Sequence, residues 1–436
     1  MKTEINEIKS WKKEVAIEVE ADALQPAIQK TIQDYRRKAN LPGFRKGKAP
    51  LSLVLKRFGD SIRADVTEEA IRSFLAQAVQ EHEVPVVAVQ EIRVTSPLSL
   101  EDSIPFAFKA DVQVRPEISI GHYKGFKVEK EIQPVHDEDV EEVLRMLREQ
   151  NARYDESDSG AQSGDIIECD IQALDPSGVP VIGQKWEDRA LMLGQPPLGP
   201  GVEEQLTGIK PGENRPFVMD IPSTEQNPTP SRQAYSIHAK KVKERKLPEL
   251  DEAFAQKVGQ VDSVPELTER IRTNLKMQHE ENAEKRLRHR IADEILKKND
   301  FELPPAMIEE SLQSLWERYQ GNPQADPRVD EKQFKEENRA GVIWNLKWEM
   351  IWREIAEEES LTVSEDTVDE EIDKAALANP KDEKKIRALF KNPQRRSGLK
   401  DQMLEEETLR FLKEHIKIKE VQIKKSKSKK SSIITP

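Results

Sequence analysis

The chain has 436 residues, more than one hydrophobic core normally serves, so roughly two to four domains are expected. Charged residues make up 34% of the sequence and hydrophobic residues 36%, a balance that favours long solvated helices over one dense globule. The net charge of −12 argues against DNA binding and general coating of nucleic acid, so any contact with RNA needs a local basic patch.

The first 115 residues are predicted to form a small α+β domain. Residues 14–20 alternate apolar and acidic side chains, which predicts a half-buried strand. Apolar residues at helical spacing follow from Asp22 to Tyr35. After a loop rich in Gly and Pro, the remaining predicted elements are helices at 50–58 and 61–82 and strands at 84–89, 92–95 and 104–114.

Residues 116–154 are predicted to connect this domain to the next module, because DEDVEEVLRMLREQNARY at 137–154 has the pattern of an amphipathic helix. The stretch DESDSGAQSG at 155–164 has the composition of a linker. Strand-like runs such as IIECDIQAL then alternate with Gly and Pro residues. Residues 155–245 are therefore assigned to a compact β-rich module.

Residues 246–421 have an almost wholly helical pattern. Their apolar stripes are thin and the other faces carry Glu, Lys and Arg, which is typical of an elongated all-helical domain. The predicted helices cover 265–298, 304–320, 328–359, 364–378, 382–391 and 398–421. Residues 422–436 are basic and of low complexity, and we expect a flexible tail there. The predicted fold class is α+β and multidomain.

Several functional classes have no support in the sequence. The single Cys169 cannot form an intrachain disulfide and fits a reducing compartment. The first residues lack the apolar core of a secretory signal, and no run approaches the ~18 apolar residues of a membrane span, so a cytoplasmic protein without a membrane partner is expected. The seven histidines lack metal-ligand spacing, and neither GxxxxGK[ST] nor GxSxG occurs, so no metal or other cofactor is expected.

The loop LPGFRKGKAP at 41–50 carries the most specific signal. Gly43 and Gly47 permit a tight, exposed turn. Between residues 30 and 60 there are nine Lys or Arg residues and two acids, a net charge of +7 in a chain whose total is −12. This segregation favours a contact with an RNA-rich partner, while charge alone leaves a solvated loop beside a charged helix equally open. The tip carries one aromatic side chain and three cations: Phe44, Arg45, Lys46 and Lys48.

Four segments resemble bacterial trigger factor, in matching order and spacing. The loop, followed by LVLKRFG, resembles the family's ribosome-docking motif. GDIIECDIQAL and MLGQPPLGPGVEEQLTGIKPGE are similar to the family's FKBP-type prolyl isomerase module. KVKERKLPELDEAFAQKVG resembles the join to the helical domain, and FELPPAMIEESL at 301–312 resembles a substrate-cradle helix. The resemblance covers nearly the whole chain.

The resemblance implies a ribosome-associated chaperone that assists folding without ATP. It implies that Phe44, Arg45 and Lys46 contact a large-subunit protein and adjacent RNA beside the exit tunnel. It also implies that the helical and N-terminal domains form a cradle over nascent and unfolded polypeptides, and that the protein is able to form a homodimer off the ribosome. A chaperone that works free of ribosomes is the alternative interpretation within this class.

The isomerase module departs from the family pattern. Catalysis of this type needs an apolar, aromatic-lined pocket and no nucleophile. By resemblance, the pocket positions are Ile171, Val181, Arg189, Leu198, Val202 and Tyr235. Only Tyr235 is aromatic, and Arg189 places a charge where a ring is expected. We therefore expect a module that folds but isomerises poorly; the alternative function is a peptidyl-prolyl cis-trans isomerase acting as a folding enzyme.

Aromatic and apolar stripes in the helical domain have two interpretations. Trp344, Trp348 and Trp352 recur at helical spacing, and a helix-packing seam is preferred over an exposed client-binding strip. Trp316 and Tyr319 are interpreted in the same way. The candidates for a client cradle, with core packing as the alternative, are Met307, Ile308, Leu312 and Trp348.

Overall fold

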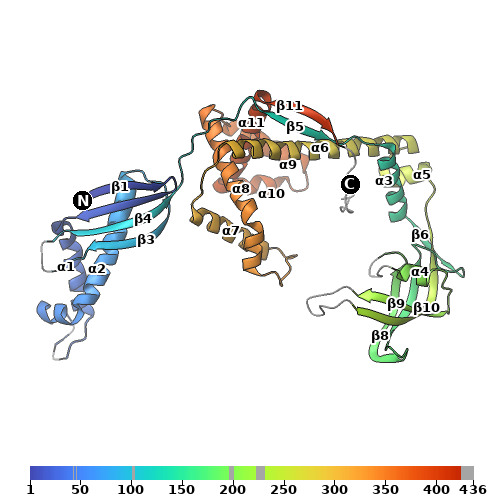
Figure 1. Cartoon of the computed structure of the whole chain (residues 1–436), viewed down its shortest axis with the longest axis horizontal. Coiled ribbons are helices and arrows are strands. Elements are labelled where there is room, and N and C mark those ends of the chain that lie inside the picture. Colours follow the sequence, from blue (N-terminus) through green and yellow to red (C-terminus); the bar gives the residue numbers. More distant parts are fainter. Residues whose placement is uncertain (43, 46, 101–103, 196–200, 222–230, 424–436) are drawn as a thin grey trace. The chain divides into compact units, whose positions relative to one another are not determined.

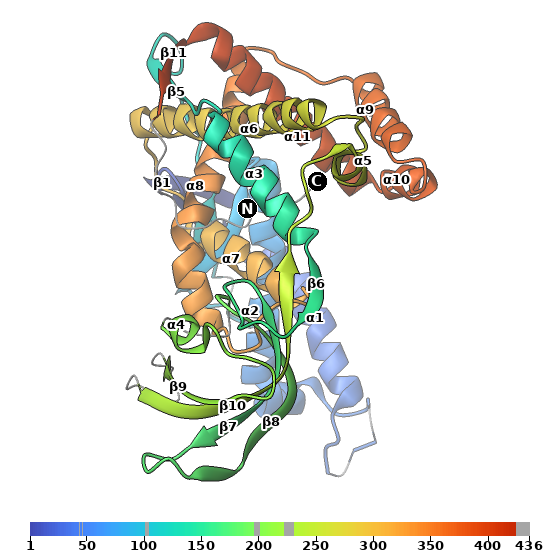
Figure 2. The same ribbon diagram turned by 90° about the vertical axis from the view of Figure 1, so that its right-hand side faces the viewer.

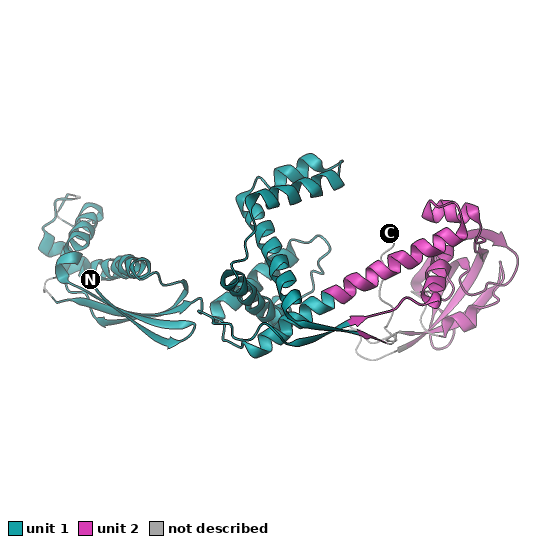
Figure 3. Cartoon of the chain, turned by 90° about the horizontal axis from the view of Figure 1, so that it is seen from above, with its two compact units in different colours: residues 1–130, 285–420 teal, residues 131–284, 421–436 magenta. Residues whose placement is uncertain are grey.

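The computed structural model describes residues 1–436 except 43, 46, 101–103, 196–200, 222–230 and 424–436. The chain divides into two compact units, each built from stretches far apart in sequence (Figure 3). The first unit contains residues 1–130 and 285–420, and the second contains residues 131–284 and 421–436. Helices and antiparallel sheets are both abundant, so the predicted α+β multidomain class is confirmed.

The N-terminal part of the first unit is a four-stranded antiparallel sheet with two helices on one face (Figure 1). The strand order is β1-β2-β4-β3, which leaves β3 at an edge. The predicted alternation is present in β2, where Val15, Ile17 and Val19 are buried beneath the helices. The elements are β1 (Lys2–Lys9), β2 (Lys12–Val19), α1 (Ala21–Lys38), α2 (Leu51–Glu81), β3 (Val86–Ser96) and β4 (Phe106–Val114).

α2 is one continuous helix of 31 residues, so the predicted break between 50–58 and 61–82 is wrong. Gly59 lowers the helix propensity locally, by about 1 kcal/mol relative to alanine. Val54, Ile62 and Val66 are fully buried along one face of the helix. Their burial against the sheet outweighs the glycine penalty. The two strands predicted between 84 and 95 are also one strand, β3, and β1 was not among the predicted strands.

The second unit contains a five-stranded antiparallel sheet. The order is β6-β10-β7-β8, and β9 pairs with the first half of β10. Figure 2 shows β7, β8 and β10 as long curved strands beside one another. The core between them and α4 includes Ile167, Cys169 and Ile237. The elements are β6 (Arg153–Ser157), β7 (Ile166–Leu174), β8 (Pro180–Met192), α4 (Val202–Leu206), β9 (Asn214–Ile221) and β10 (Ser231–Lys246).

The segment with the composition of a linker, 155–164, is an ordered part of this module. β6 pairs with the end of β10, from Arg153 opposite Lys246 to Ser157 opposite Val242. Ala161 is fully buried, and its backbone N–H donates to Ile209 O at 2.9 Å. The polar residues suggested a linker, but those at 155–157 belong to an edge strand, β6, whose side chains are mostly exposed to solvent.

Three helices form a smaller core in the second unit. They are α3 (Asp137–Gln150), α5 (Glu252–Gly259) and the first half of α6 (Val264–Lys298). Val140, Phe254 and Leu267 are buried where these helices meet. The amphipathic stripe predicted at 137–154 is thus a packing face, and the helix ends at Gln150.

The rest of the first unit is helical, with one small sheet. The helices are the second half of α6 and α7 (Pro305–Gln320), α8 (Glu331–Glu358), α9 (Glu365–Ala378), α10 (Glu383–Leu389) and α11 (Pro393–His415). The helix predicted to reach residue 421 is wrong at its end, because β11 (Lys417–Gln422) pairs with β5 (Lys127–Ile132). The alternating residues of KIKEVQ follow a two-residue period that fits a strand.

The tryptophan stripe of α8 is a packing seam, as preferred from the sequence. Trp344 Nε1 donates to Asp293 Oδ1 on α6 at 2.7 Å, and Trp348 Nε1 donates to Glu405 Oε1 on α11 at 2.8 Å. Trp348 and Trp352 are buried in a core shared by these three helices. The seam therefore fixes α8 to helices on both sides.

Replacing Trp348 with alanine is expected to lower the free energy of unfolding of this core by about 3 kcal/mol, because a large buried side chain leaves a cavity. Trp348→Phe keeps most of the apolar surface and loses the hydrogen bond to Glu405, so it is expected to cost about 1 kcal/mol. Urea denaturation followed by circular dichroism measures both. Equal stability of the alanine variant and the parent would contradict this packing.

Candidate functional site

The loop at residues 41–50 joins α1 to α2 and is fixed at both ends. Leu41 and Ala49 are buried in the core beneath the helices. Arg36 Nε donates to Ala49 O at 2.9 Å, which holds the end of the loop against α1. Gly47 has a φ of +78°, a conformation that residues with a side chain rarely adopt. These contacts anchor the two ends of the loop.

The side chains at the tip are exposed. Phe44 is 43% exposed, and Arg45 and Lys48 are also exposed. Lys46 lies outside the described residues. Phe44 therefore offers an aromatic ring to a partner beside the cations Arg45 and Lys48.

Few of the cations near the loop have a carboxylate partner. Lys30 Nζ lies 3.8 Å from Glu69, and Arg37 lies 3.2 Å from Asp34. The described part of the chain provides no ion pair for Lys38, Arg45, Lys48, Lys56 and Arg57. Leu51 and Leu53, at the start of α2, add exposed apolar surface next to the loop. The arrangement suits a partner that offers both phosphates and apolar side chains.

The structure brings together only some of the predicted isomerase positions. Ile171 on β7 and Tyr235 on β10 pack against the same core. Val202 is fully buried in that core and Arg189 is exposed on β8, so neither lines a pocket, contrary to the prediction. Val181 is half-buried at the far end of β8. Leu198 lies outside the described residues.

An aromatic group that the sequence analysis missed surrounds Tyr235. The Phe217 ring stacks on Tyr235 with centroids 5.5 Å apart, and the Trp186 centroid lies 6.2 Å from Tyr235. Trp186 pairs with Ile171, while Arg189 pairs with Cys169, so β8 advances three residues as β7 advances two. This irregularity places Trp186, and not Arg189, beside Ile171. Trp186, three residues before Arg189, was the feature of the sequence that could have indicated this aromatic group.

The predicted cradle residues divide into two groups. Leu312 and Trp348 are buried, so they pack helices and do not offer surface to a client. The cradle assignment is wrong for both, and the packing alternative applies. Met307 and Ile308 on α7 are half-buried and stay candidates. Trp316 and Tyr319 form a ring cluster with Phe334 of α8, with centroids 4.8 to 5.6 Å apart, so their packing interpretation is confirmed.

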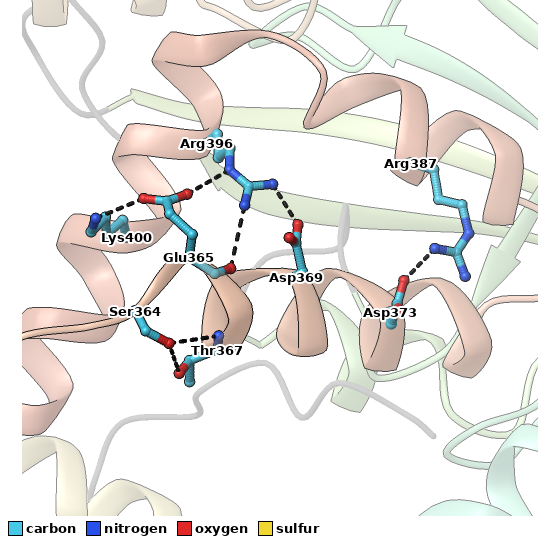
Figure 4. Close-up of polar contacts among 8 residues, drawn as sticks. All are labelled: Ser364, Glu365, Thr367, Asp369, Asp373, Arg387, Arg396 and Lys400. Atoms are coloured by element: carbon cyan, nitrogen blue, oxygen red, sulfur yellow. Dashed lines mark hydrogen bonds and ion pairs between the residues drawn. The ribbon is translucent and has the colours of Figure 1, made fainter.

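The exposed apolar residues of the helical part include Leu377, at the end of α9, and Leu389, at the end of α10. Arg396 of α11 binds α9 to the rest of the unit, and Arg387 of α10 pairs with α9 (Figure 4). The Arg396 guanidinium lies 2.9 Å from Glu365 and 2.5 Å from Asp369, and Arg387 pairs with Asp373.

The two carboxylates that Arg396 binds, Glu365 and Asp369, are sensitive to acid. Lys400 and Arg396 hold the pKa of Glu365 below its ordinary value, and Arg396 does the same for Asp369. Because these pKa values are lowered by folding, the contribution of the pairs is present above the ordinary carboxylate range and is lost as the pH falls through the folded-state values. Both groups are exposed, so salt also weakens the pairs.

Within the described ranges, no group of three or more His, Cys, Asp or Glu side chains is placed to hold a metal ion. Among those same residues, no helix combines the length and the apolar character needed to cross a bilayer.

Two family models match the chain. Residues 1–147 match the family described as bacterial trigger factor protein, and residues 263–414 match the C-terminus of the same family. A trigger factor from Moorella thermoacetica is 30% identical over 424 residues, covering 93% of each chain. A trigger factor from Syntrophotalea carbinolica is 28% identical over 430 residues, covering 97% of each chain.

A solved structure shares the fold. It is described as "Promiscuous Substrate Recognition in Folding and Assembly Activities of the Trigger Factor Chaperone". The match has a TM-score of 0.51 and 17% identity, and it covers 94% of this chain and 99% of that chain. Together with the relatives that align along almost the entire sequence, these matches establish that the chain belongs to the bacterial trigger factor family.

Proposed function

We propose that this chain is a ribosome-associated chaperone that docks through the loop at 41–50 and shelters emerging polypeptides without nucleotide. The observation that carries the proposal is the exposed Phe44 on a loop fixed at both ends. It stands beside Arg45 and Lys48, for which the described residues provide no ion pair. A net charge of −12 gives the rest of the chain no general attraction to RNA. Family membership supports the same role.

We assign the roles by segment. Residues 1–115 dock, 116–154 connect, 155–245 form the isomerase-like module, 246–421 hold clients, and 422–436 are a basic tail. The client surface uses half-buried and exposed apolar residues, including Met307, Ile308, Leu377 and Leu389. Scattered apolar contacts in a charged surface bind many unfolded segments weakly, and weak binding lets each client leave and fold. Docking makes the encounter with the emerging chain intramolecular and so raises its effective concentration. The site of action is the cytoplasm.

Cosedimentation of the full chain with ribosomes tests the docking proposal. If Arg45, Lys46 and Lys48 each neutralise one phosphate, the affinity falls roughly twenty- to fortyfold between about 50 and 200 mM salt, because bound counterions are released. Binding that is independent of salt, or absent at low salt, would contradict the proposal.

A role as primarily an isomerase is not favoured. Arg189 is in solvent and Val202 is inside the core, so two of the predicted pocket positions do not face a substrate. The aromatic group of Trp186, Phe217 and Tyr235 gives the module an apolar surface that can hold a peptide.

We expect prolyl isomerisation by the full chain at less than about one tenth of the rate of an ordinary FKBP, because lowering a barrier of about 18–20 kcal/mol requires a closely fitting pocket. A protease-coupled assay on an Ala-Leu-Pro-Phe substrate measures the rate. Turnover equal to that of an FKBP, and lost in Tyr235→Ala, would show that the module is catalytic.

A further inference from the structure

The inner face of the edge strand β3 is apolar and uncovered. Val86, Val89, Ile92 and Val94 stand opposite Val114, Val112, Ala110 and Phe108 of β4, all of which are buried. The face of β3 thus continues the core face of the sheet. Yet Val89, Ile92 and Val94 are 41 to 46% exposed, because the helices do not extend over this edge.

Irregular pairing creates this face. Spacings of three residues, as from Val86 to Val89 and on to Ile92, would place alternate residues on opposite faces of a regular strand. β3 pairs irregularly with β4 between Val86 and Ala88 and again between Val89 and Glu91. Each irregularity inserts one residue, so the apolar side chains return to the same face.

α2 supplies the other wall of a groove. Ile71, Leu75 and Val79 of the helix face the valines of β3 across an open groove of about 950 Å³. This volume is at the upper end of the roughly 300–1,000 Å³ typical of ligand sites, and it accommodates several side chains.

The charges at the rim of the groove neutralise one another. Arg63 lies 3.3 Å from Asp60, and Arg72 lies 2.8 Å from Glu68. The groove therefore complements an occupant without net charge. An RNA strand or the lysine-rich residues 424–436 would find no opposite charge here.

The dimensions favour a short segment over a second copy of the chain. The groove is lined by 14 residues, fewer than the roughly 20–30 residues a side of a stable protein interface. The irregularities of β3 also interrupt the even row of backbone donors and acceptors that strand addition requires. Binding must therefore come from burial of side chains.

We propose that the groove between α2 and β3 binds an uncharged, apolar segment of an emerging polypeptide. The proposal rests on the proposed docking function, because α2 begins one residue after the loop. The lining residues of α2 run from Asp60 to Val79, which places them roughly 14 to 42 Å along the helix from its start. A docked chain would present this apolar groove close to its ribosome contact.

Site-specific cross-linking tests the groove. Ile92→Cys and Ile8→Cys replace exposed isoleucines at opposite edges of the same sheet, so Ile8→Cys is a matched control. Each full-length variant is labelled with benzophenone maleimide and illuminated with a capped nine-residue peptide of Val, Leu, Ile and Ser. We expect a yield about tenfold higher at position 92 than at position 8, because only the groove buries the peptide. Equal yields overturn the proposal.

A second substitution tests whether the cross-link depends on the apolar, uncharged lining of the groove. Val94→Asp, added to Ile92→Cys, places an unpaired charge in the neutral groove and is expected to reduce the yield about tenfold. An unchanged yield overturns the proposal. A cross-linked dimer formed in place of the peptide adduct also overturns it and identifies a second copy as the occupant.

Cosedimentation of the same labelled variants with vacant ribosomes separates the two proposals. Equal cross-linking at positions 92 and 8 with intact ribosome binding overturns the groove alone. Preferential cross-linking at position 92 in a chain that does not bind ribosomes overturns the docking function and leaves a peptide groove. We expect both ribosome binding and preferential cross-linking.

Discussion

Substituting Phe44, Arg45 and Lys46 with alanine together is expected to weaken ribosome binding roughly a thousandfold, which removes the protein from the ribosome pellet. An exposed aromatic anchor accounts for about 2–3 kcal/mol of this loss, and each cation for about 1 kcal/mol. The fold is expected to survive, because Leu41, Ala49 and the Arg36 bond to Ala49 anchor the loop independently of these side chains.

A matched triple substitution controls for the loss of charge and apolar surface. Ile8→Ala, Lys2→Ala and Lys9→Ala remove one exposed apolar side chain and two cations from β1. We expect this variant to sediment with ribosomes like the parent. If the loop variant sedimented as well as the control, the protein would have to bind ribosomes elsewhere or act free of them.

The sequence predicted those elements whose periodicity was regular and whose ends were marked. Alternation in β2 and helical spacing in α6 and α8 depend on local burial, and the structure matches them closely. The break assigned near Gly59 failed because the burial of Ile62 and Val66 against the sheet outweighs a local propensity. Similarly, a polar edge strand such as β6 has the composition of a linker.

Exposure was the property that the sequence could not resolve. Leu312 and Trp348 lie on amphipathic stripes that suit either a client surface or a helix seam, and only the neighbouring helices decide between them. Ile92 shows the opposite case. It has the pattern of a core strand, but it is exposed because it lies where the helical layer ends. The position of Trp186 was also hidden from the sequence, because an irregularity in the pairing of β8 places this residue beside Tyr235. The anchored loop, in contrast, was visible from its glycines and charges.

The thiol of Cys169 is expected to react with thiol reagents at pH 8 roughly a thousandfold more slowly in the native chain than in guanidinium chloride. Cys169 lies on β7 and is fully buried. Burial, with a smaller contribution from Asp170, raises the pKa of the thiol from 9.0 to about 12. Only the thiolate attacks these reagents, so the native rate falls in proportion to the ionised fraction.

The same shift in pKa predicts how stability depends on alkaline pH. Below about pH 9 the thiol is neutral in both the folded and the unfolded chain, and it does not affect the balance. Between about pH 9 and 12 the unfolded thiol ionises while the buried thiol does not, so stability decreases by up to about 1.4 kcal/mol per pH unit. Cys169→Ala is expected to remove this part of the alkaline loss, which urea titrations at pH 8 and pH 10 measure.

Release of thionitrobenzoate from Ellman's reagent measures the reactivity of the thiol directly. Ile92→Cys provides an exposed comparison, because position 92 is 41% exposed on the same chain, and its added thiol is expected to react within the mixing time of a concentrated reagent. The variant should then release one equivalent quickly and the second only after guanidinium chloride is added. Fast release of both equivalents in buffer would mean that Cys169 on β7 is accessible to solvent. The packing of the core that places Ile171 beside Trp186 and Tyr235 would then be wrong.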